Sequence, residues 1–301
     1  MSALSKGSGA PADDGGSSLA RANPLTQDEL VRFRRDGFVV LRKLFSPEEI
    51  AEIRDTFMAM AAHGPVEGLS EKKPAMNRGA TPEYGPGDPL ALYPRMLHPH
   101  KHLDKPVGPL SLRYMLHPKL EPILTALFGE EPVAVQSMFY FKPPGSRGQD
   151  LHQDNYYLRV KPKTCVAAWV TIDDADEDNG GMRCVPGTGS YPLQCPEESD
   201  LSESFTTEHV APPAGSRAQA LTLEAGDVLF FNGSVIHGSG PNLSATRFRR
   251  AFICHYVPLG TTELSDWYST PVRFNGELRS IPAATGGGPC GSTGDGAQGP
   301  H

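Results

Sequence analysis

The spacing of apolar residues changes near residue 130, and this change constrains the fold more than any other feature of the sequence. From Val133 onward apolar residues alternate with a period of two, as in "VAVQSMFYFK". One predicted face carries Val133, Val135, Phe139 and Phe141, and the other carries Gln136, Met138, Tyr140 and Lys142. The later short runs "CVAAWVTID", "MRCV", "QALTL", "DVLFF" and "RRAFICHYV" are separated by turn sequences such as "EDNGG" and "EAGD". Short strands without alternating helices favour an antiparallel sandwich or barrel over a parallel doubly wound sheet.

Three helices are predicted before these strands. Thr26 and Glu29 have the spacing of a capping box, and Gly37 is placed to end the helix that follows. The sequence "SPEE" at 46–49 repeats the start signal for a second helix. A third helix is expected over 120–128, where apolar residues recur with helical spacing and a glycine follows.

The chain is predicted to form one domain over residues 23–282. Residues 1–22 and 283–301 are rich in glycine, alanine and serine, and we expect both segments to be disordered tails. Residues 63–110 form a long connection rich in proline, glycine and charge, which is typical of a functional lid. No repeat of fixed period or domain linker stands out.

Composition excludes several classes of function. The net charge of −7 and the pI near 5.8 argue against a nucleic-acid partner. No apolar run approaches the roughly 18 residues that suggest a membrane span. The five cysteines lie far apart without a C-x-x-C pair, which predicts reduced thiols and a cytoplasmic location, with Cys290 in a tail and without a role. A nucleic-acid or membrane partner is therefore not expected, and the oligomeric state does not follow from the sequence.

His152 and Asp154, in "DLHQDNYYLRV", are candidate metal ligands. On a strand, positions i and i+2 project to the same side, so this pair would share a face. The pair alone is a weak signal, because the pattern His-x-Asp is common. His237 follows an apolar strand and opens a loop rich in glycine and serine, where it can supply a third ligand. Two histidines and one carboxylate form the facial triad of non-haem Fe(II) oxygenases, which leaves positions open for substrates.

Arg249 lies twelve residues after His237 on the next predicted strand. A guanidinium there can bind a carboxylate through two parallel hydrogen bonds. That arrangement suits a dicarboxylate co-substrate that also chelates the metal.

These motifs together resemble the phytanoyl-CoA dioxygenase (PhyH) family of Fe(II)/2-oxoglutarate oxygenases. The similar segments are "LTQDELVRFRRDGFVVLRKLFSPEEI", "HQD", "DNGGMRCVPGTGS" and "HGSGPNLS…RFRRAFICHY", and the resemblance covers roughly residues 24–260. It implies a double-stranded β-helix (a cupin-like jelly roll) with an all-β core and flanking helices.

The resemblance also implies roles for individual residues. His152, Asp154 and His237 would bind Fe(II), and Arg249 would bind the C5 carboxylate of 2-oxoglutarate, with Arg247 as the alternative. The positions that would support the co-substrate are Ser239 and Trp169, with Gln136 and Lys142 on the strand that lines its pocket. The expected lid or substrate contacts are Arg78, Tyr84, Tyr93, Arg95 and His98.

The implied reaction consumes O2 and converts 2-oxoglutarate to succinate and CO2, forming an oxidant that removes hydrogen from the prime substrate. Because Asp154 is retained, the halide-binding arrangement of related halogenases is not expected. Hydroxylation, desaturation, ring closure and epimerisation stay open as outcomes. The resemblance implies a small-molecule substrate. No CoA-binding signature is evident, and family members of this kind often modify natural products, so a specialised-metabolite or sugar-containing substrate is our hypothesis.

Two other functions compete with this interpretation. A cupin-type metalloenzyme that does not use 2-oxoglutarate would not need Arg249, and a non-catalytic binding module would not need the triad. Two further clusters are weaker metal candidates. The histidines in "PRMLHPHKHLD" are interpreted as polar loop residues, and "DDADEDNGG" as a solvated turn, since it lacks the spacing of a Ca²⁺ loop.

Overall fold

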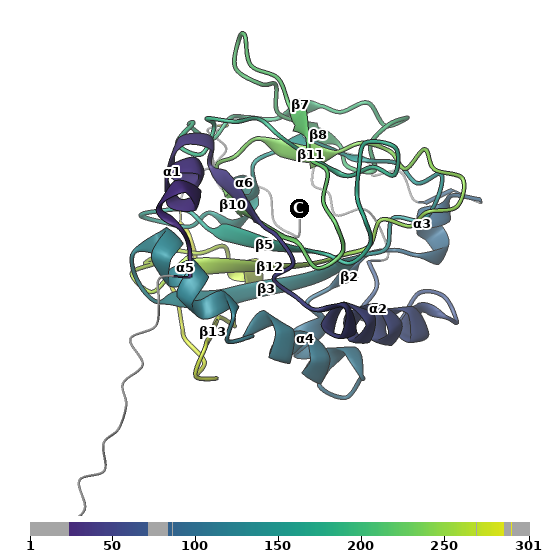
Figure 1. Cartoon of the computed structure of the whole chain (residues 1–301), viewed down its shortest axis with the longest axis horizontal. Helices are drawn as coiled ribbons and strands as arrows, with labels where there is room; N and C mark the ends of the chain where they lie inside the picture. The colour runs from purple at the N-terminus through teal and green to yellow at the C-terminus, as the bar shows by residue number, and fades with distance from the viewer. Residues whose placement is uncertain (1–23, 72–83, 86, 269, 286–289, 291–301) are drawn as a thin grey trace, which may run out of the picture.

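The structure is a computed structural model, and it describes residues 24–71, 84–85, 87–268, 270–285 and 290. The predicted N-terminal tail lies outside these residues. Two sheets face each other across the molecule (Figure 1), which confirms the predicted jelly roll of antiparallel strands. The described sheets do not join into one closed barrel.

The larger sheet has seven strands, and all of its pairs are antiparallel. Its strands, in spatial order, are β1 (Phe38–Leu41), β10 (Val228–Asn232), β5 (Val166–Thr171), β12 (Ala251–Pro258), β3 (Pro132–Tyr140) and β13 (Val272–Arg273), with β2 (Met96–Leu97) also paired to β3. The central strands β5 and β12 are buried at every residue, because one face packs on helices and the other faces the second sheet.

The smaller sheet has four short strands. They are ordered β4 (Gln149–His152), β11 (His237–Ser239), β6 (Met182–Cys184) and β9 (Gln219–Ala220). A separate hairpin of β7 (Glu197–Glu198) and β8 (Glu208–His209) lies beside β4. The helix α6 (Asp154–Leu158) begins two residues after β4 ends.

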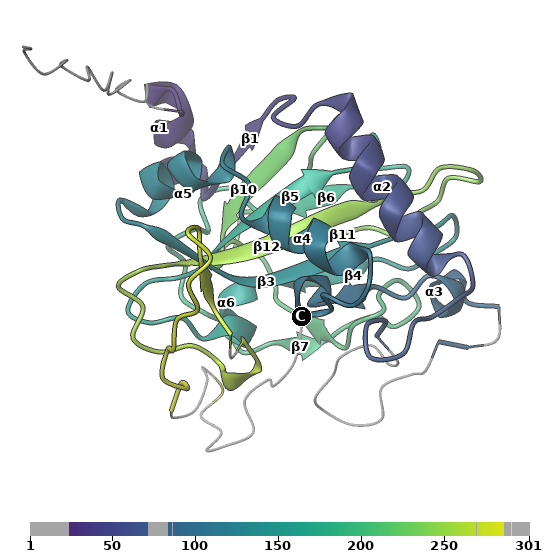
Figure 2. The same cartoon turned by 90° about the horizontal axis from the view of Figure 1, so that it is seen from below.

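Helices cover the outer face of the larger sheet, as Figure 2 shows from below. They are α2 (Pro47–Ala61), α4 (Val107–Met115) and α5 (Leu120–Phe128), while α1 (Gln27–Asp36) and α3 (Pro89–Leu92) lie at the periphery. Two short 3-10 helices are η1 (Pro99–Lys101), which packs on α4 and β3, and η2 (Asp266–Tyr268). Phe57 of α2 stacks on Phe139 of β3 with ring centroids 4.0 Å apart, at the centre of the main apolar core. In the described part of the chain, no helix has the length and apolar character needed to cross a membrane.

The three predicted helices are confirmed. Thr26 and Ser46 each complete a capping box with the glutamate three residues later. Gly37 ends α1 with a φ of 87°, a conformation that glycine adopts without the steric cost of a Cβ atom. The helix α4 was not predicted. It begins inside the long connection 63–110, whose described parts also contain α3, β2 and η1.

Two expectations need correction. The five cysteines are not all reduced, because Cys195 and Cys290 form a disulfide across 95 positions of sequence, and Cys290 therefore has a structural partner. Sequence spacing cannot reveal such a pairing. Cys165, Cys184 and Cys254 are free and buried, as small apolar residues would be. The predicted strand "RRAFICHYV" begins at Ala251, so Arg249 precedes it.

Candidate metal centre and anion site

The two candidate histidine ligands lie side by side on neighbouring strands of the smaller sheet. His152 ends β4 and His237 begins β11, and the two residues are direct partners in the antiparallel register. Their ring centroids lie 4.3 Å apart, and both side chains are buried. His237 starts a short strand of the second sheet, whereas the sequence predicted that it opens a loop.

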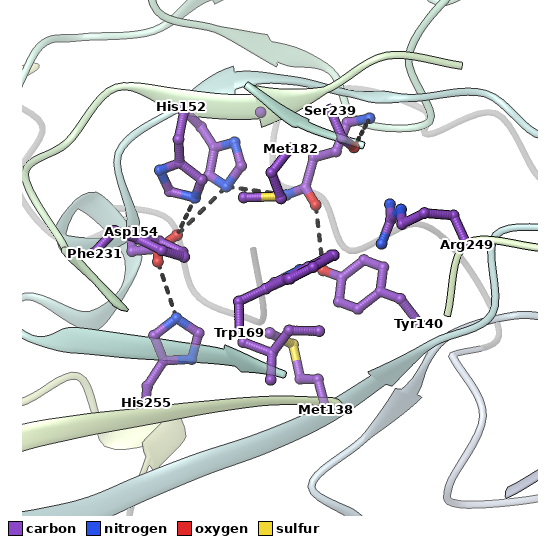
Figure 3. Close-up of a pocket in the computed structure, with 14 residues that line it drawn as sticks. Met138, Tyr140, His152, Asp154, Trp169, Met182, Phe231, Ser239, Arg249 and His255 are labelled. Carbon is purple, nitrogen blue, oxygen red and sulfur yellow. Dashed lines mark hydrogen bonds and ion pairs between the residues drawn. The ribbon is translucent and has the colours of Figure 1, made fainter. Parts of the chain in front are cut away.

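Asp154 completes the group from the first residue of α6, so a strand end and a helix start bring the pair together, not one continuous strand. Its Oδ1 atom lies 3.4 Å from His152 Nε2 and 3.3 Å from His237 Nε2. Figure 3 shows His152 and Asp154 on one side of the cavity between the sheets, and His237 completes the group there. One ligand atom from each of His152, Asp154 and His237 lies within 4.8 Å of the other two, and no other such group of His, Cys, Asp or Glu occurs among the described residues.

Backbone carbonyl groups fix which nitrogen of each histidine faces the site. His152 Nδ1 donates to the carbonyl oxygen of Asp150 at 2.8 Å, and His237 Nδ1 donates to that of Val235 at 2.9 Å. A carbonyl only accepts, so both Nδ1 atoms carry the proton and both Nε2 lone pairs are available to a metal. His255 Nε2 donates to Asp154 Oδ2 at 2.9 Å, which leaves Oδ1 directed at the two Nε2 atoms.

These three donors fit a divalent metal ion. Ligand bonds of about 2.1 Å at right angles would separate neighbouring donor atoms by about 3 Å, which is close to the separations observed. All three ligands come from one side, so the other side of a bound ion would face the cavity. The two imidazoles and one carboxylate form the donor set of the facial triad.

Two buried cations lie at the other end of the same region. Arg249 Nε donates to the carbonyl oxygen of Gly180 at 3.0 Å, and its guanidinium lies 5.4 Å from the centre of the Trp169 ring. Lys142 Nζ donates to Ser239 Oγ at 2.9 Å and to the carbonyl oxygen of Gly240. Neither cation has a carboxylate within 4.0 Å among the described residues.

The environment of these cations is unfavourable without an anion. Burial lowers the pKa of Arg249 to about 10. Burial, and then repulsion from Arg249 and Arg183, lowers the pKa of Lys142 well below its usual range. Buried charges in proteins are normally paired, so this pair predicts an anionic ligand.

Arg247, the alternative anchor, lies elsewhere. Its guanidinium makes two hydrogen bonds to Asp176, at 2.8 and 2.9 Å, and its side chain is 41% exposed. Asp176 belongs to the acidic segment "DDADEDNGG", which forms a turn that receives this arginine. The geometry therefore favours Arg249 over Arg247 for an anion inside the cavity.

A model of the family described as phytanoyl-CoA dioxygenase (PhyH) matches residues 33–251, well over half of the chain. The chain belongs to this family. It is an Fe(II)- and 2-oxoglutarate-dependent dioxygenase. Iron, 2-oxoglutarate and O2 are thus the metal, the co-substrate and the oxidant of this PhyH enzyme.

Individual relatives agree with the family assignment. The chain is 26% identical over 265 residues to phytanoyl-CoA dioxygenase 1 of Oryza sativa subsp. japonica, covering 82% of this chain and 92% of the relative. It is 27% identical over 250 residues to peroxisomal phytanoyl-CoA dioxygenase of Bos taurus, covering 78% of this chain and 69% of the relative.

Solved structures support the fold. The carbocyclase SnoK from nogalamycin biosynthesis superposes with a TM-score of 0.59 at 18% identity, covering 86% of this chain and 88% of SnoK. EvdO2 from Micromonospora carbonacea var. aurantiaca, complexed with 2-oxoglutarate, superposes with a TM-score of 0.56 at 20% identity, covering 83% of this chain and 93% of EvdO2.

The remaining predicted co-substrate residues of this PhyH enzyme do not all line the metal cavity, and Lys142 lines an adjoining pocket. Ser239 and Trp169 line the cavity with the metal ligands and Arg249. Gln136 is buried opposite His255 in the β3–β12 register but does not line that cavity.

The expected substrate contacts lie outside the metal cavity. Tyr84, Tyr93 and Arg95 line an adjoining pocket, which also touches Lys142 and Arg249. His98 is buried beside Trp267 and Tyr268, where burial lowers the pKa of its imidazole. Arg78 lies outside the described residues. Of the other histidines in that segment, His100 bonds Ser137, and none joins a described group of converging metal donors.

Three residues of the cavity were not predicted to have a role. Tyr140 and Gln149 line it between the metal ligands and Arg249, and His255 supports Asp154. Tyr140 was placed correctly on the polar face of β3, which was the available signal. His255 shares a strand face with Ile253, so alternation could have directed it inward. Nothing in the sequence singles out Gln149.

Proposed function

We propose that His152, Asp154 and His237 hold Fe(II), and that Arg249 and Lys142 receive the C5 carboxylate of 2-oxoglutarate. Ser239 would orient Lys142, and Trp169 would form the floor beneath the co-substrate. The observation that carries this proposal is the pairing of opposite chemistries in one region. Three converging metal donors lie at one end, and two buried cations without a carboxylate partner among the described residues lie at the other.

The chain's own residues would prepare the site before chemistry begins. When bound, the iron and 2-oxoglutarate activate O2 and supply the oxidant. Arg249 and Lys142 would neutralise the distal carboxylate and so fix the length of co-substrate that fits. His255 would hold Asp154 in its orientation, as outer hydrogen bonds commonly do for metal ligands. The apolar side chains of Met138, Phe231 and Ile253 would limit the access of water to the reacting atoms.

For the prime substrate we propose a small specialised-metabolite or sugar-containing molecule, which the enzyme would hydroxylate, cyclise or desaturate. Support comes from fold relatives: a structure similar to this chain, with a TM-score of 0.59 at 19% identity, is SnoN in complex with Fe³⁺, alpha ketoglutarate and nogalamycin RO. The apolar cavity wall with Tyr140 and Gln149 as polar groups suits such a molecule. A cytoplasmic location is part of the same proposal, although some curated relatives are peroxisomal.

An anaerobic titration tests the site assignment. Apoprotein receives Fe(II) and then 2-oxoglutarate while the visible absorption spectrum is recorded, with His152→Ala as the control. We expect a weak charge-transfer band that needs both additions and is absent from the variant. Iron binding without a band would favour a cupin-type metalloenzyme that does not use 2-oxoglutarate, and no iron binding would favour a binding module.

A second experiment tests the substrate class. Succinate release is measured with phytanoyl-CoA and, separately, with a panel of glycosylated aromatic metabolites. We expect stimulation by members of the panel and none by phytanoyl-CoA. Stimulation by phytanoyl-CoA alone would contradict the proposed substrate class and leave the metal and co-substrate assignments intact.

A further inference from the structure

A hydrogen-bonded chain of side chains runs from the long connection before β3 to a candidate metal ligand. Arg95 Nε donates to Glu71 Oε2 at 2.7 Å, and its Nη2 donates to Glu71 Oε1 at 2.9 Å. The third nitrogen, Nη1, donates to the Tyr140 hydroxyl at 2.6 Å. Tyr140 donates to Gln149 Oε1 at 3.2 Å, and Gln149 Nε2 lies 3.2 Å from His152 Nε2. Figure 3 shows two members of this chain, Tyr140 near Arg249 and His152 on the other side of the cavity.

The direction of every hydrogen bond in the chain follows from its first member. A guanidinium only donates, so the Tyr140 oxygen accepts from Arg95 and its hydrogen is left for the Gln149 carbonyl oxygen. That bond fixes the orientation of the amide, since Oε1 faces Tyr140 and the NH2 group faces His152. Because His152 Nδ1 carries the proton, Nε2 is an acceptor, and the chain ends on the lone pair that a metal would use.

The chain joins regions that are far apart in sequence. Glu71 and Arg95 lie on two short segments that pair with each other, because Glu71 N donates to the Arg95 carbonyl oxygen at 2.9 Å and Ser70 bridges Met96. Both charged side chains are almost fully buried, with exposures of 2% for Arg95 and 3% for Glu71. Tyr140 lines both the metal cavity and the adjoining pocket that contains Arg95, so its hydroxyl is the link between them.

We propose that Arg95 is a positioning residue. Acting through Tyr140, it fixes the orientation of the Gln149 amide beside the candidate metal ligands. This inference rests on the proposed function. Once a metal takes His152 Nε2, the Gln149 NH2 group is left as a donor directed at the metal's open side, where an oxygen of the bound co-substrate can accept it. Tyr140 keeps the amide in that orientation. Without the hydroxyl the amide can turn over and present its carbonyl oxygen, which repels an acceptor.

The alternative is that Arg95 and Glu71 only fasten the two segments to β3. The alternatives differ at Tyr140, because a fastening role needs its packing and not its hydroxyl. Tyr140→Phe removes one oxygen and keeps the ring. Arg95→Lys keeps a positive charge beside Glu71 but loses the planar fork that serves Glu71 and Tyr140 together. Tyr114→Phe is a matched control, because the Tyr114 ring is also buried and its hydroxyl bonds Glu52 on the outer helices.

The readout is the dissociation constant of 2-oxoglutarate from the anaerobic Fe(II) protein, followed by the charge-transfer band, together with the thermal midpoint. We expect a rise of about 3- to 10-fold for Tyr140→Phe and for Arg95→Lys, corresponding to one lost hydrogen bond. The Fe(II) affinity should stay within about two-fold, and the control should match the wild type. The double variant should bind 2-oxoglutarate no more weakly than the weaker-binding single variant, since either change already interrupts the chain of hydrogen bonds.

An unchanged 2-oxoglutarate affinity in Tyr140→Phe would overturn the inference, even if the thermal midpoint fell. Additive effects in the double variant, or an equal effect in Tyr114→Phe, would overturn it too. A wild-type protein that binds Fe(II) but shows no band with 2-oxoglutarate would instead refute the proposed function, so the two failures are distinguishable.

Discussion

The two sheets of this enzyme differ in length of strand and in what they carry. The larger sheet has strands of up to nine residues, buried almost throughout, and contributes Trp169 and Tyr140 to the cavity. The smaller sheet has strands of two to four residues and carries His152 and His237. The difference separates stability from chemistry: the long strands supply the core, and the short ones present polar side chains to the cavity.

Short strands need other contacts to fix their side chains. The β4–β11 ladder changes register between His237 and Ser239, so its backbone bonds alone define the geometry poorly. Each histidine ring is instead oriented by a carbonyl group two residues before it in the chain. Gly238 allows the close approach of the strands, since a Cβ atom there would lie 2.8 Å from the Gln149 carbonyl oxygen. Local hydrogen bonds and close backbone contacts thus position the candidate metal ligands, and extensive apolar packing is not needed there.

The largest effect is expected from Phe139→Ala in the larger sheet. Phe139 is fully buried and stacks on Phe57, so truncation should lower the free energy of unfolding by about 3–5 kcal/mol. Urea denaturation followed by circular dichroism measures the change. The folded variant should still bind Fe(II), and Leu278→Ala, at a residue that is 73% exposed, should be nearly neutral. Loss of metal binding from a folded Phe139→Ala protein would contradict the division between the sheets.

Arg249→Met tests the proposed binding site for the co-substrate carboxylate and leaves the candidate metal ligands unchanged. Removing the guanidinium leaves the co-substrate carboxylate without its main partner, so the dissociation constant of 2-oxoglutarate should rise about 100-fold. Fe(II) affinity should not change, because the Arg249 guanidinium bonds the Gly180 carbonyl oxygen and no residue of the triad. The charge-transfer band measures the first and metal titration the second. Arg247→Met, which removes an exposed ion pair, is the control, and an equal loss there would reverse the assignment.

The sequence predicted the larger sheet better than the smaller one, for a physical reason. The apolar runs of β5, β10 and β12 reflect burial on both faces, and the alternation in "VAVQSMFYFK" separates an apolar from a more polar face of β3. Strands of two or three residues are too short to show a period. The strand expected at "QALTL" is reduced to Gln219–Ala220, and β11 was interpreted as loop.

The triad and its anion site could be predicted only as residue types in a workable order. Motif resemblance selected His152, Asp154, His237 and Arg249, and the structure brings all four to one cavity. Their roles stay predictions until metal and co-substrate binding are measured. The contacts of Arg95 and His255 depend on side chains 24 and 101 positions away in sequence, so no local pattern could reveal them.

His255→Leu should lower the affinity for metal, although His255 belongs to the larger sheet and is not a candidate ligand. The variant removes the donor that holds Asp154 Oδ2, and loss of such an outer contact typically costs about 10- to 100-fold in metal affinity. Titration with Co(II), read from its visible absorption, measures the change. His100→Leu is the control, since that histidine is also buried but bonds Ser137. Equal affinities in wild type and His255→Leu would show that α6 alone positions Asp154.

Compared with Phe139→Ala, Arg249→Met and His255→Leu, the smallest effect is expected from Lys142→Met. Lys142 lies where the two sheets meet, because it follows β3 and reaches Ser239 of β11. Burial and the neighbouring Arg249 lower its pKa, so the free enzyme loses this charge as pH rises through that lowered value. Since the charged form attracts a dianion, the affinity of the wild type for 2-oxoglutarate should fall with rising pH. Lys142→Met should bind about 10-fold more weakly at low pH, as expected for the loss of one charge-assisted hydrogen bond, and should lose this pH dependence. The Fe(II) and 2-oxoglutarate band, titrated across pH, measures both quantities. If the slope persisted in the variant, another group would control the anion end, and the link between the sheets at Lys142 would be structural only.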